Sequence, residues 1–255
     1  MIRFASLGSG SAGNALLVES GATCVLVDCG FNQRETLRRL TRLKRDIGNI
    51  SAILVTHEHG DHAGGVFALA RRHGLTVWLT HGTLAACQHL AEGVEICLFD
   101  SHAAFAIGAL EITPYPVPHD AREPVQYVFS DGHRRLGLLT DAGEVTQHIR
   151  DMLSGVDGLI LECNHDAALL AASAYPPALK RRISGRLGHL ENEAAAGLLR
   201  EIDRCRLQHV VAAHLSERNN RPDLARTALA GALGCSEDWV GVASQSEGFA
   251  WRQLA

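Results

Sequence analysis

The stretch Thr56-His57-Glu58-His59-Gly60-Asp61-His62 decides the fold, and it follows the apolar run Ser51-Ala52-Ile53-Leu54-Val55. Three imidazoles and the Asp61 carboxylate stand within six residues, directly after a segment that is typical of a buried strand. Neutral imidazole and carboxylate are the nitrogen and oxygen ligands that zinc and similar divalent ions bind. Because such an ion with an open coordination position activates water near neutral pH, the stretch predicts a metal site that carries out hydrolysis.

The spacing of these ligands predicts how they divide. His57 and His59 are two residues apart, so an extended backbone after the strand directs both to the same side. Asp61 and His62 precede the apolar segment 63–70 and are expected at the start of a helix. Two pairs of ligands suggest two metal ions. Surface histidines in a polar loop are the alternative, but the pattern H-x-H-x-D-H next to a buried strand favours the metal site.

Length and composition fit a compact enzyme. We expect a single domain over residues 1–255, because 46% of the residues are hydrophobic and can form a substantial core. No segment of about 18 apolar residues is available to cross a bilayer, and the N-terminal residues lead straight into a strand pattern without the apolar segment of a signal peptide. The sequence therefore predicts a cytoplasmic protein without membrane contact, whose seven cysteines are reduced.

Positive charge is concentrated in two clusters, although the formal net charge of −4 argues against a generally basic nucleic-acid-binding protein. The first cluster is Arg34, Arg38, Arg39, Arg42, Lys44 and Arg45, and the second is Lys180, Arg181, Arg182 and Arg186. The planar guanidinium of arginine suits phosphate oxygens. A solvated helix face explains such clusters equally well, and we expect phosphate contact first of all from Arg181 and Arg182.

Strand and helix patterns alternate in two comparable halves without a linker. Strands are expected at 2–6, 14–19, 23–28, 51–55, 76–79, 95–98, 104–107, 110–115, 125–130, 134–140, 158–161, 209–212 and 248–252. Helices are expected at 33–43, 63–72, 83–90, 191–202 and 222–230. Strands followed by helices, and then the same order again, predict an α/β (α+β) protein in which two sheets pack face to face and helices cover their outer surfaces.

A glycine-rich segment, Gly8-Ser9-Gly10-Ser11-Ala12-Gly13, follows a strand and matches the dinucleotide-binding pattern G-x-G-x-x-G. Asp28 lies about where a ribose-binding acid is expected. However, Asn14-Ala15-Leu16-Leu17-Val18 looks like a second strand and not like the helix that would bind the phosphates. The glycines therefore favour a tight turn near the site, in which Ser9, Ser11, Asn14 and backbone N–H groups face a phosphate.

Further ligands are expected where other strands end. His119 follows one predicted strand, Asp141 ends a second and His214 ends a third. Each of these residues, taken alone, is an equally good turn former. Only their order along the chain, together with the earlier candidate ligands, makes them candidate metal ligands.

Taken together, these residues resemble the metallo-β-lactamase superfamily, whose pattern is an early Asp after a strand, H-x-H-x-D-H, a later His, an Asp and a final His. Asp28, the 57–62 stretch, His119, Asp141 and His214 supply all five parts in that order. The resemblance spans about residues 3–222 and implies an αββα four-layer sandwich with two metal ions. It implies that one ion is bound by His57, His59 and His119 and the other by Asp61, His62 and His214, that Asp141 bridges them, and that Asp28 orients a ligand from behind.

Several further motifs are similar to those of the YycJ/WalJ group within that superfamily. They are the segments 7–14 and 175–183, Pro118-His119-Asp120-Ala121, Leu161-Glu162-Cys163-Asn164-His165-Asp166, Gly188-His189-Leu190-Glu191-Asn192-Glu193 and His214-Leu215-Ser216-Glu217-Arg218-Asn219-Asn220. This group implies a DNA exonuclease that acts from the 5′ end, with a role in DNA repair. The last two motifs are also similar to those of RNase Z and of phosphonate-pathway phosphodiesterases, in which a His placed like His189 assists proton transfer.

A phosphodiester substrate also agrees with the charge of the site. Two divalent ions, the Asp61 and Asp141 carboxylates and a bridging hydroxide leave about one net positive charge if the ligand histidines are neutral, which suits an anionic diester. We predict that Asp61 and His189 are catalytic, and that His189 donates a proton to the leaving oxygen. Glu162 or Asp166 is expected to orient His189, and Asn164, His165 and Asn219 are expected to contact the substrate.

The sequence therefore predicts a metal-dependent phosphodiesterase that acts on nucleic acid, namely a DNA exonuclease. Its two divalent ions are expected to be zinc or manganese, with iron as a further candidate, because the same ligands accept all three. Two alternatives stay open. One is a phosphodiesterase of the same fold that acts on RNA or on small diesters, and the other is a metal-binding regulatory protein without turnover.

Overall fold

The computed structural model describes residues 1–255 and contains two seven-stranded sheets. The first sheet has the strand order β14 (Phe249–Gln253), β1 (Ile2–Gly8), β2 (Ala15–Ser20), β3 (Thr23–Val27), β4 (Ala52–Leu54), β5 (Val77–Leu79) and β6 (Ile96–Leu98). The second has the order β13 (Gly241–Val242), β12 (His209–Ala213), β11 (Gly158–Glu162), β10 (Arg135–Leu139), β9 (Val125–Ser130), β8 (Leu110–Pro116) and β7 (Phe105–Ile107).

Helices connect these strands on both sides of the molecule. The first half of the chain contains α1 (Gln33–Arg42), α2 (Gly60–Ala63), α3 (Val66–His73) and α4 (His81–Cys87). The second half contains α5 (Gln147–Leu153), α6 (Ala167–Ala172), α7 (Pro177–Ile183), α8 (Asn192–Glu201) and α9 (Pro222–Leu233). Short 3-10 helices lie at Ile47–Asn49, Gln88–Leu90 and Glu237–Trp239. No helix is both long enough and apolar enough to span a membrane.

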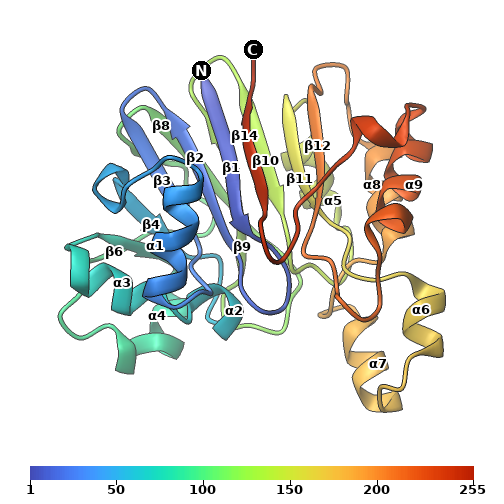
Figure 1. Cartoon of the computed structure of the whole chain (residues 1–255), viewed down its shortest axis with the longest axis horizontal. Helices are drawn as coiled ribbons and strands as arrows, with labels where there is room; N and C mark the ends of the chain where they lie inside the picture. Colours follow the sequence, from blue (N-terminus) through green and yellow to red (C-terminus); the bar gives the residue numbers. More distant parts are fainter.

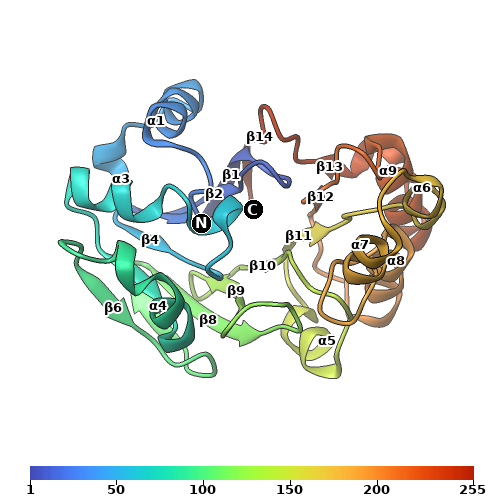
Figure 2. The same cartoon turned by 90° about the horizontal axis from the view of Figure 1, so that it is seen from below.

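The elements form four layers, with the two sheets in the middle and helices on both outer surfaces (Figures 1 and 2). Three apolar cores lie between the layers, one of them between the two sheets. In β11, Ile160 contributes to the core between the sheets, whereas Leu159 and Leu161 contribute to the core beneath α5, α8 and α9. Successive side chains of a strand point to opposite faces, so both faces are buried. The predicted αββα architecture is confirmed.

Parallel strands bring several chain segments to one edge of the sandwich. In the first sheet β3 is parallel to β4, and in the second β10, β11 and β12 are parallel. Parallel neighbours end at the same edge of a sheet. The Tyr127 hydroxyl donates to the Val55 carbonyl (2.6 Å), and the Val125 N–H donates to the Thr56 carbonyl (3.0 Å), so the end of β4 is fixed to the second sheet.

Three residues at these strand ends have a left-handed backbone. The φ angle is 59° at Asp28, 53° at Asp141 and 55° at His214, and only Lys44 among the other non-glycine residues has a positive φ. A left-handed residue turns the chain sharply and costs about 1–3 kcal/mol. The three strained positions are all residues that the sequence analysis assigned to the site.

The structure corrects the sequence analysis at the helices. The helix expected over 63–72 is divided into α2 and α3, because the Gly65 N–H donates to the Cys29 carbonyl (2.7 Å) and leaves the helical pattern. The helices α5, α6 and α7 were not expected. Each has only six or seven residues and at most two buried side chains, so none shows a helical period in the sequence.

The two ends of the chain share one sheet, because β14 pairs with β1. Figure 1 shows both termini at the same end of the sandwich. The single domain over residues 1–255 stays a prediction.

Replacing Gly30 by alanine is expected to destabilise the protein and displace the ligand-bearing loop. A Cβ atom at Gly30 would lie 1.9 Å from the Asp61 carbonyl oxygen, and such overpacking costs about 1–3 kcal/mol. Gly197→Ala is the matched control, because a Cβ atom there has nothing within 4 Å in the middle of α8. This control should raise the stability by about 0.5–1 kcal/mol. Urea unfolding measures both, and an unchanged unfolding free energy for Gly30→Ala would contradict the packing described here.

Candidate metal centre

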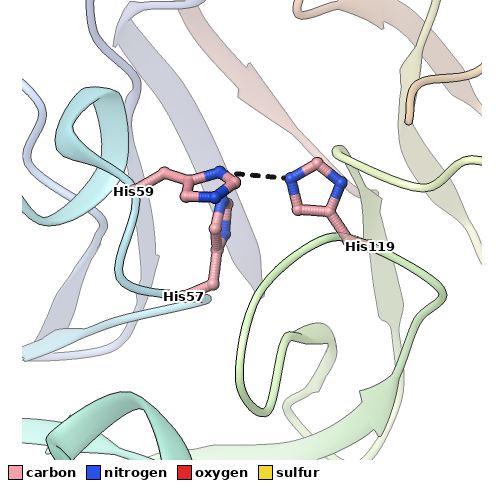
Figure 3. Close-up of side chains that lie close together, drawn as sticks. All are labelled: His57, His59 and His119. Carbon is pink, nitrogen blue, oxygen red and sulfur yellow. Dashed lines mark hydrogen bonds between the residues drawn. The ribbon is translucent and has the colours of Figure 1, made fainter. Parts of the chain in front are cut away.

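His57, His59 and His119 form a first cluster of imidazoles (Figure 3). Nδ1 of His59 lies 3.3 Å from Nε2 of His119. The ring centroid of His57 lies 4.6 Å from that of His59 and 5.0 Å from that of His119. One ligand nitrogen from each residue lies within 4.8 Å of the other two. These three nitrogens could hold one divalent ion.

Asp61, His62 and His214 form a second cluster of the same kind. Oδ2 of Asp61 lies 3.4 Å from Nε2 of His214 and 3.5 Å from Nε2 of His62. Asp141 reaches both clusters, because its Oδ2 lies 3.1 Å from Nε2 of His62 and its Oδ1 lies 3.9 Å from Nε2 of His119. The structure thus brings together all seven residues that the sequence analysis assigned to metal binding.

Polar contacts at Nδ1 orient four of these imidazoles, so Nε2 is the ring nitrogen that could bind a metal. The partners are the Thr56 hydroxyl for His57 (3.0 Å), Asp28 for His62 (2.8 Å) and the Gly188 carbonyl for His119 (3.0 Å). Nδ1 of His214 lies 3.3 Å from both Oε1 of Glu162 and the Asn164 amide nitrogen. Asp28 also accepts hydrogen bonds from the backbone N–H and the hydroxyl of Thr56, both at 2.8 Å. The buried Asp28 carboxylate therefore orients two ligand residues, one directly and one through Thr56.

The protonation of His57 and Asp141 fits divalent cations. Nε2 of His57 and Oδ2 of Asp141 are buried and make no hydrogen bond. Burial lowers the pKa of His57 well below its ordinary value, which keeps this imidazole in the neutral form that binds metal. Burial acts to raise the pKa of Asp141, but the charges of His214 and His62 outweigh it and hold this pKa well below its usual range. Neutral imidazole and ionised carboxylate are the donors that zinc and similar ions need. At His62 and His214 burial acts to lower the pKa, but the neighbouring carboxylates outweigh it and raise the pKa, to about 10 for His214, so metal binding would displace a proton from each of these rings.

Glu162 and His189 form a hydrogen-bonded pair beside the two clusters. Glu162 is completely buried at the end of β11 and accepts a hydrogen bond from Nδ1 of His189 (2.9 Å). Its other oxygen accepts from the backbone N–H groups of Ala142 (2.9 Å) and Leu190 (3.2 Å). Burial acts to raise the pKa of Glu162, but its contacts with His189 and His214 lower it to about 2. The carboxylate thus holds His189 so that Nε2 is its free ring nitrogen.

Ser9 and Asn14 brace the glycine-rich loop from within instead of facing the cavity. The Ser9 hydroxyl donates to Oδ1 of Asn14 (3.2 Å) and accepts from the backbone N–H of His214 (2.9 Å). The Asn14 amide donates to the Gly10 carbonyl (3.1 Å), and its nitrogen also lies 3.1 Å from Nε2 of His62. Both residues are therefore placed to position metal-ligand candidates.

Other residues predicted around the substrate lie deeper in the protein or further away. The Asn164 amide donates to the His214 carbonyl (3.0 Å). His165 and Asn219 are each only 1% exposed, so a substrate cannot reach them directly. Asp166 makes no hydrogen bond to His189 but caps α6 by accepting from the Leu169 N–H (2.9 Å). Arg181 is exposed on α7.

A cavity of about 220 Å³ opens onto the two clusters. It is lined by Ser11, His59, Asp61, Asp120, Asp141, Leu179, Arg182, Ile183, Gly188, His189 and His214. Of the predicted substrate-binding residues, only Ser11 and Arg182 line it. The Arg182 guanidinium forms an ion pair with Asp120 (2.6 Å). Sequence reasoning missed Asp120, Leu179 and Ile183, although the last two are four residues apart and flank the cationic cluster.

Comparison with known proteins agrees with this geometry. The family model of the beta-lactamase superfamily domain matches residues 23–215. The metallo-beta-lactamase fold protein YhfI from Bacillus subtilis has a TM-score of 0.76 to this structure at 18% sequence identity, covering 98% of each chain. The chain therefore belongs to the beta-lactamase superfamily and is a hydrolase of the metallo-β-lactamase fold.

Two relatives define a narrower group. The chain is 35% identical to exodeoxyribonuclease YycJ of Bacillus anthracis over 235 residues, and this match covers 91% of the chain and 89% of YycJ. It is 32% identical to exodeoxyribonuclease WalJ of Streptococcus pneumoniae over 246 residues, and this match covers 94% of the chain and 91% of WalJ. The resemblance to the YycJ/WalJ group, stated from the motifs, is confirmed.

Asp28→Asn is expected to weaken metal binding about 10–100-fold, because an amide cannot accept from both Thr56 and His62 as the carboxylate does. Competition titration with a chromophoric zinc chelator measures the affinity. Asp151→Asn, an exposed carboxylate on α5, is the matched control and should bind zinc like the wild type. Wild-type affinity in Asp28→Asn would show that the Asp28 carboxylate does not orient a ligand.

Proposed function

We propose that this protein is a 5′-to-3′ exodeoxyribonuclease that uses two divalent metal ions. The observation that carries the proposal is the convergence of two three-residue ligand clusters on the Asp141 carboxylate. The names of YycJ and WalJ support DNA as the substrate. The seven cysteines, none of which forms a disulfide, support an assignment to the cytoplasm.

The two clusters define the proposed ligand sets. His57, His59 and His119 would hold one ion, and Asp61, His62 and His214 would hold the other. Asp141 would bridge the two ions. Zinc or manganese is the proposed metal, with iron as a further candidate, because imidazole and carboxylate ligands accept all three.

The residues of the chain divide the work of phosphodiester hydrolysis. When bound, the metal ions supply an activated water molecule and stabilise negative charge on the phosphate oxygens. His189 donates a proton from Nε2 to the leaving oxygen, and Glu162 holds the ring through Nδ1 and stabilises its positive charge before the transfer. Arg182 and Ser11 contact the phosphates of the strand at the wall of the cavity.

The wild-type protein with zinc or manganese is expected to shorten single-stranded DNA from its 5′ end. A 5′-labelled oligonucleotide should release a labelled mononucleotide at once, whereas a 3′-labelled one should give a descending ladder. Asp61→Ala and His62→Ala should abolish both products, and His89→Ala, an exposed histidine outside the site, should not.

Other outcomes of this assay contradict the proposal in distinct ways. A ladder from the 5′ label would reverse the proposed polarity. Cleavage confined to RNA or to bis-p-nitrophenyl phosphate would identify a different phosphodiesterase. Stoichiometric metal without cleavage of any diester would favour a regulatory metal-binding protein.

His189→Ala is expected to lower kcat on DNA about 10²–10⁴-fold, because a sugar alkoxide cannot leave without a proton. With bis-p-nitrophenyl phosphate the loss should be much smaller, since p-nitrophenolate is a weak base that leaves unprotonated. Steady-state kinetics on both substrates, with metal content measured in parallel, checks this difference. Equal losses on both substrates would mean that His189 is not the proton donor.

A further inference from the structure

The wall of the metal cavity contains two apolar side chains that lie outside the three apolar cores. Leu179 and Ile183 lie four residues apart on α7, so they share one face of this helix. Both are only partly exposed and both line the cavity. Neither belongs to any of the three apolar cores or packs against one. The two side chains thus form an apolar part of the cavity wall that lies outside the cores.

The other lining residues of the cavity have a different character. Apart from Gly188, they are polar or charged side chains, most of them in or beside the proposed ligand sets. Such groups recognise a phosphate, but they do not explain an aliphatic pair next to it. A nucleotide carries both characters, because its phosphate is anionic whereas the faces of its base are neutral and apolar.

We propose that Leu179 and Ile183 form a nucleobase subsite for the nucleotide next to the scissile phosphate. This inference rests on the proposed nuclease function and adds to it the part of the substrate that α7 recognises. Arg182 lies between the two residues in the sequence and in the same cavity wall, where it is 65% exposed in its ion pair with Asp120. An exposed ion pair of this kind is weak, so the guanidinium can exchange the carboxylate for a phosphate of the strand.

The subsite also has a defined selectivity. Aliphatic side chains contact the face of a base and read no pattern of hydrogen-bond donors and acceptors, so all four bases are accepted. A base can enter only if it is unpaired and unstacked. The subsite therefore favours a single-stranded end over a blunt duplex end.

A cycle of enzyme and substrate changes tests the subsite. Leu179→Ser and Ile183→Ser are each combined with three single-stranded oligonucleotides: one intact, one abasic at the first nucleotide and one abasic at the second. On the intact strand each variant should lose roughly ten-fold in kcat/KM, mainly through KM. On one of the two abasic strands, the kcat/KM of the wild type should fall by a similar factor relative to the intact strand. On that same abasic strand, the serine variant should have the same kcat/KM as the wild type.

Control variants separate this result from unfolding. Leu179→Met and Ile183→Leu keep an apolar side chain and should lose much less kcat/KM on the intact strand than the serine variants do. Leu90→Ser removes a leucine that is 40% exposed, lies in the 3-10 helix Gln88–Leu90 and does not line the cavity, so it should have no effect. Metal content should stay unchanged in all variants.

The unfavourable outcomes are distinguishable. If the serine variants lose the same factor on the intact strand and on both abasic strands, or lose nothing on the intact strand, the base subsite is wrong and the nuclease function stands. If the wild type cleaves no oligonucleotide, the proposed function fails and the subsite fails with it.

Discussion

Buried negative charge is the constraint on which the rest of this structure depends. Asp141 is 2% exposed and Glu162 is fully buried, and both carboxylates lie among the imidazoles of the site. An ionised carboxylate is stable inside a protein only when positive charge or several hydrogen bonds compensate its lost hydration. Glu162 obtains this from two backbone N–H groups and His189. Asp141 has an oxygen without a hydrogen bond, so divalent cations beside it would stabilise the fold as well as the reaction.

The framework concentrates backbone strain where these charges lie. Asp28, Asp141 and His214 all adopt left-handed conformations within two residues of the end of a strand that is buried on both faces. A strand that is buried on one face only could move and so relieve the backbone strain. These strands cannot, because each is packed between two cores and is hydrogen-bonded to parallel neighbours. The sandwich thus supplies the stability that tolerates about 1–3 kcal/mol of strain at each position. In return, three side chains from distant segments are directed to one edge of the sandwich.

The sequence predicted the site residues that lie close together along the chain or at the ends of strands. It did not predict contacts between residues that are far apart in the sequence. The pattern of residues 57–62 contains four candidate ligands within six residues. His119, Asp141 and His214 could be assigned because they follow predictable apolar strands in the order of the superfamily pattern. The roles of Ser9 and Asn14 could not be read, because the bond from the His214 N–H to Ser9 joins residues 205 positions apart. The helix α7 was missed for another reason: it buries no residue in a core, so it has no hydrophobic period to detect.

Because α7 lies outside the cores, metal binding and the proposed substrate binding depend on different parts of the structure. Ligand positions are fixed by buried hydrogen bonds such as those of Asp28 and Glu162, and a change there leaves an unpaired charge inside the protein, which is strongly destabilising. The side chains of α7 make no core contact, and substitutions at such positions usually change stability by less than about 0.5 kcal/mol. Substrate preference can therefore change on α7 without disturbing metal binding.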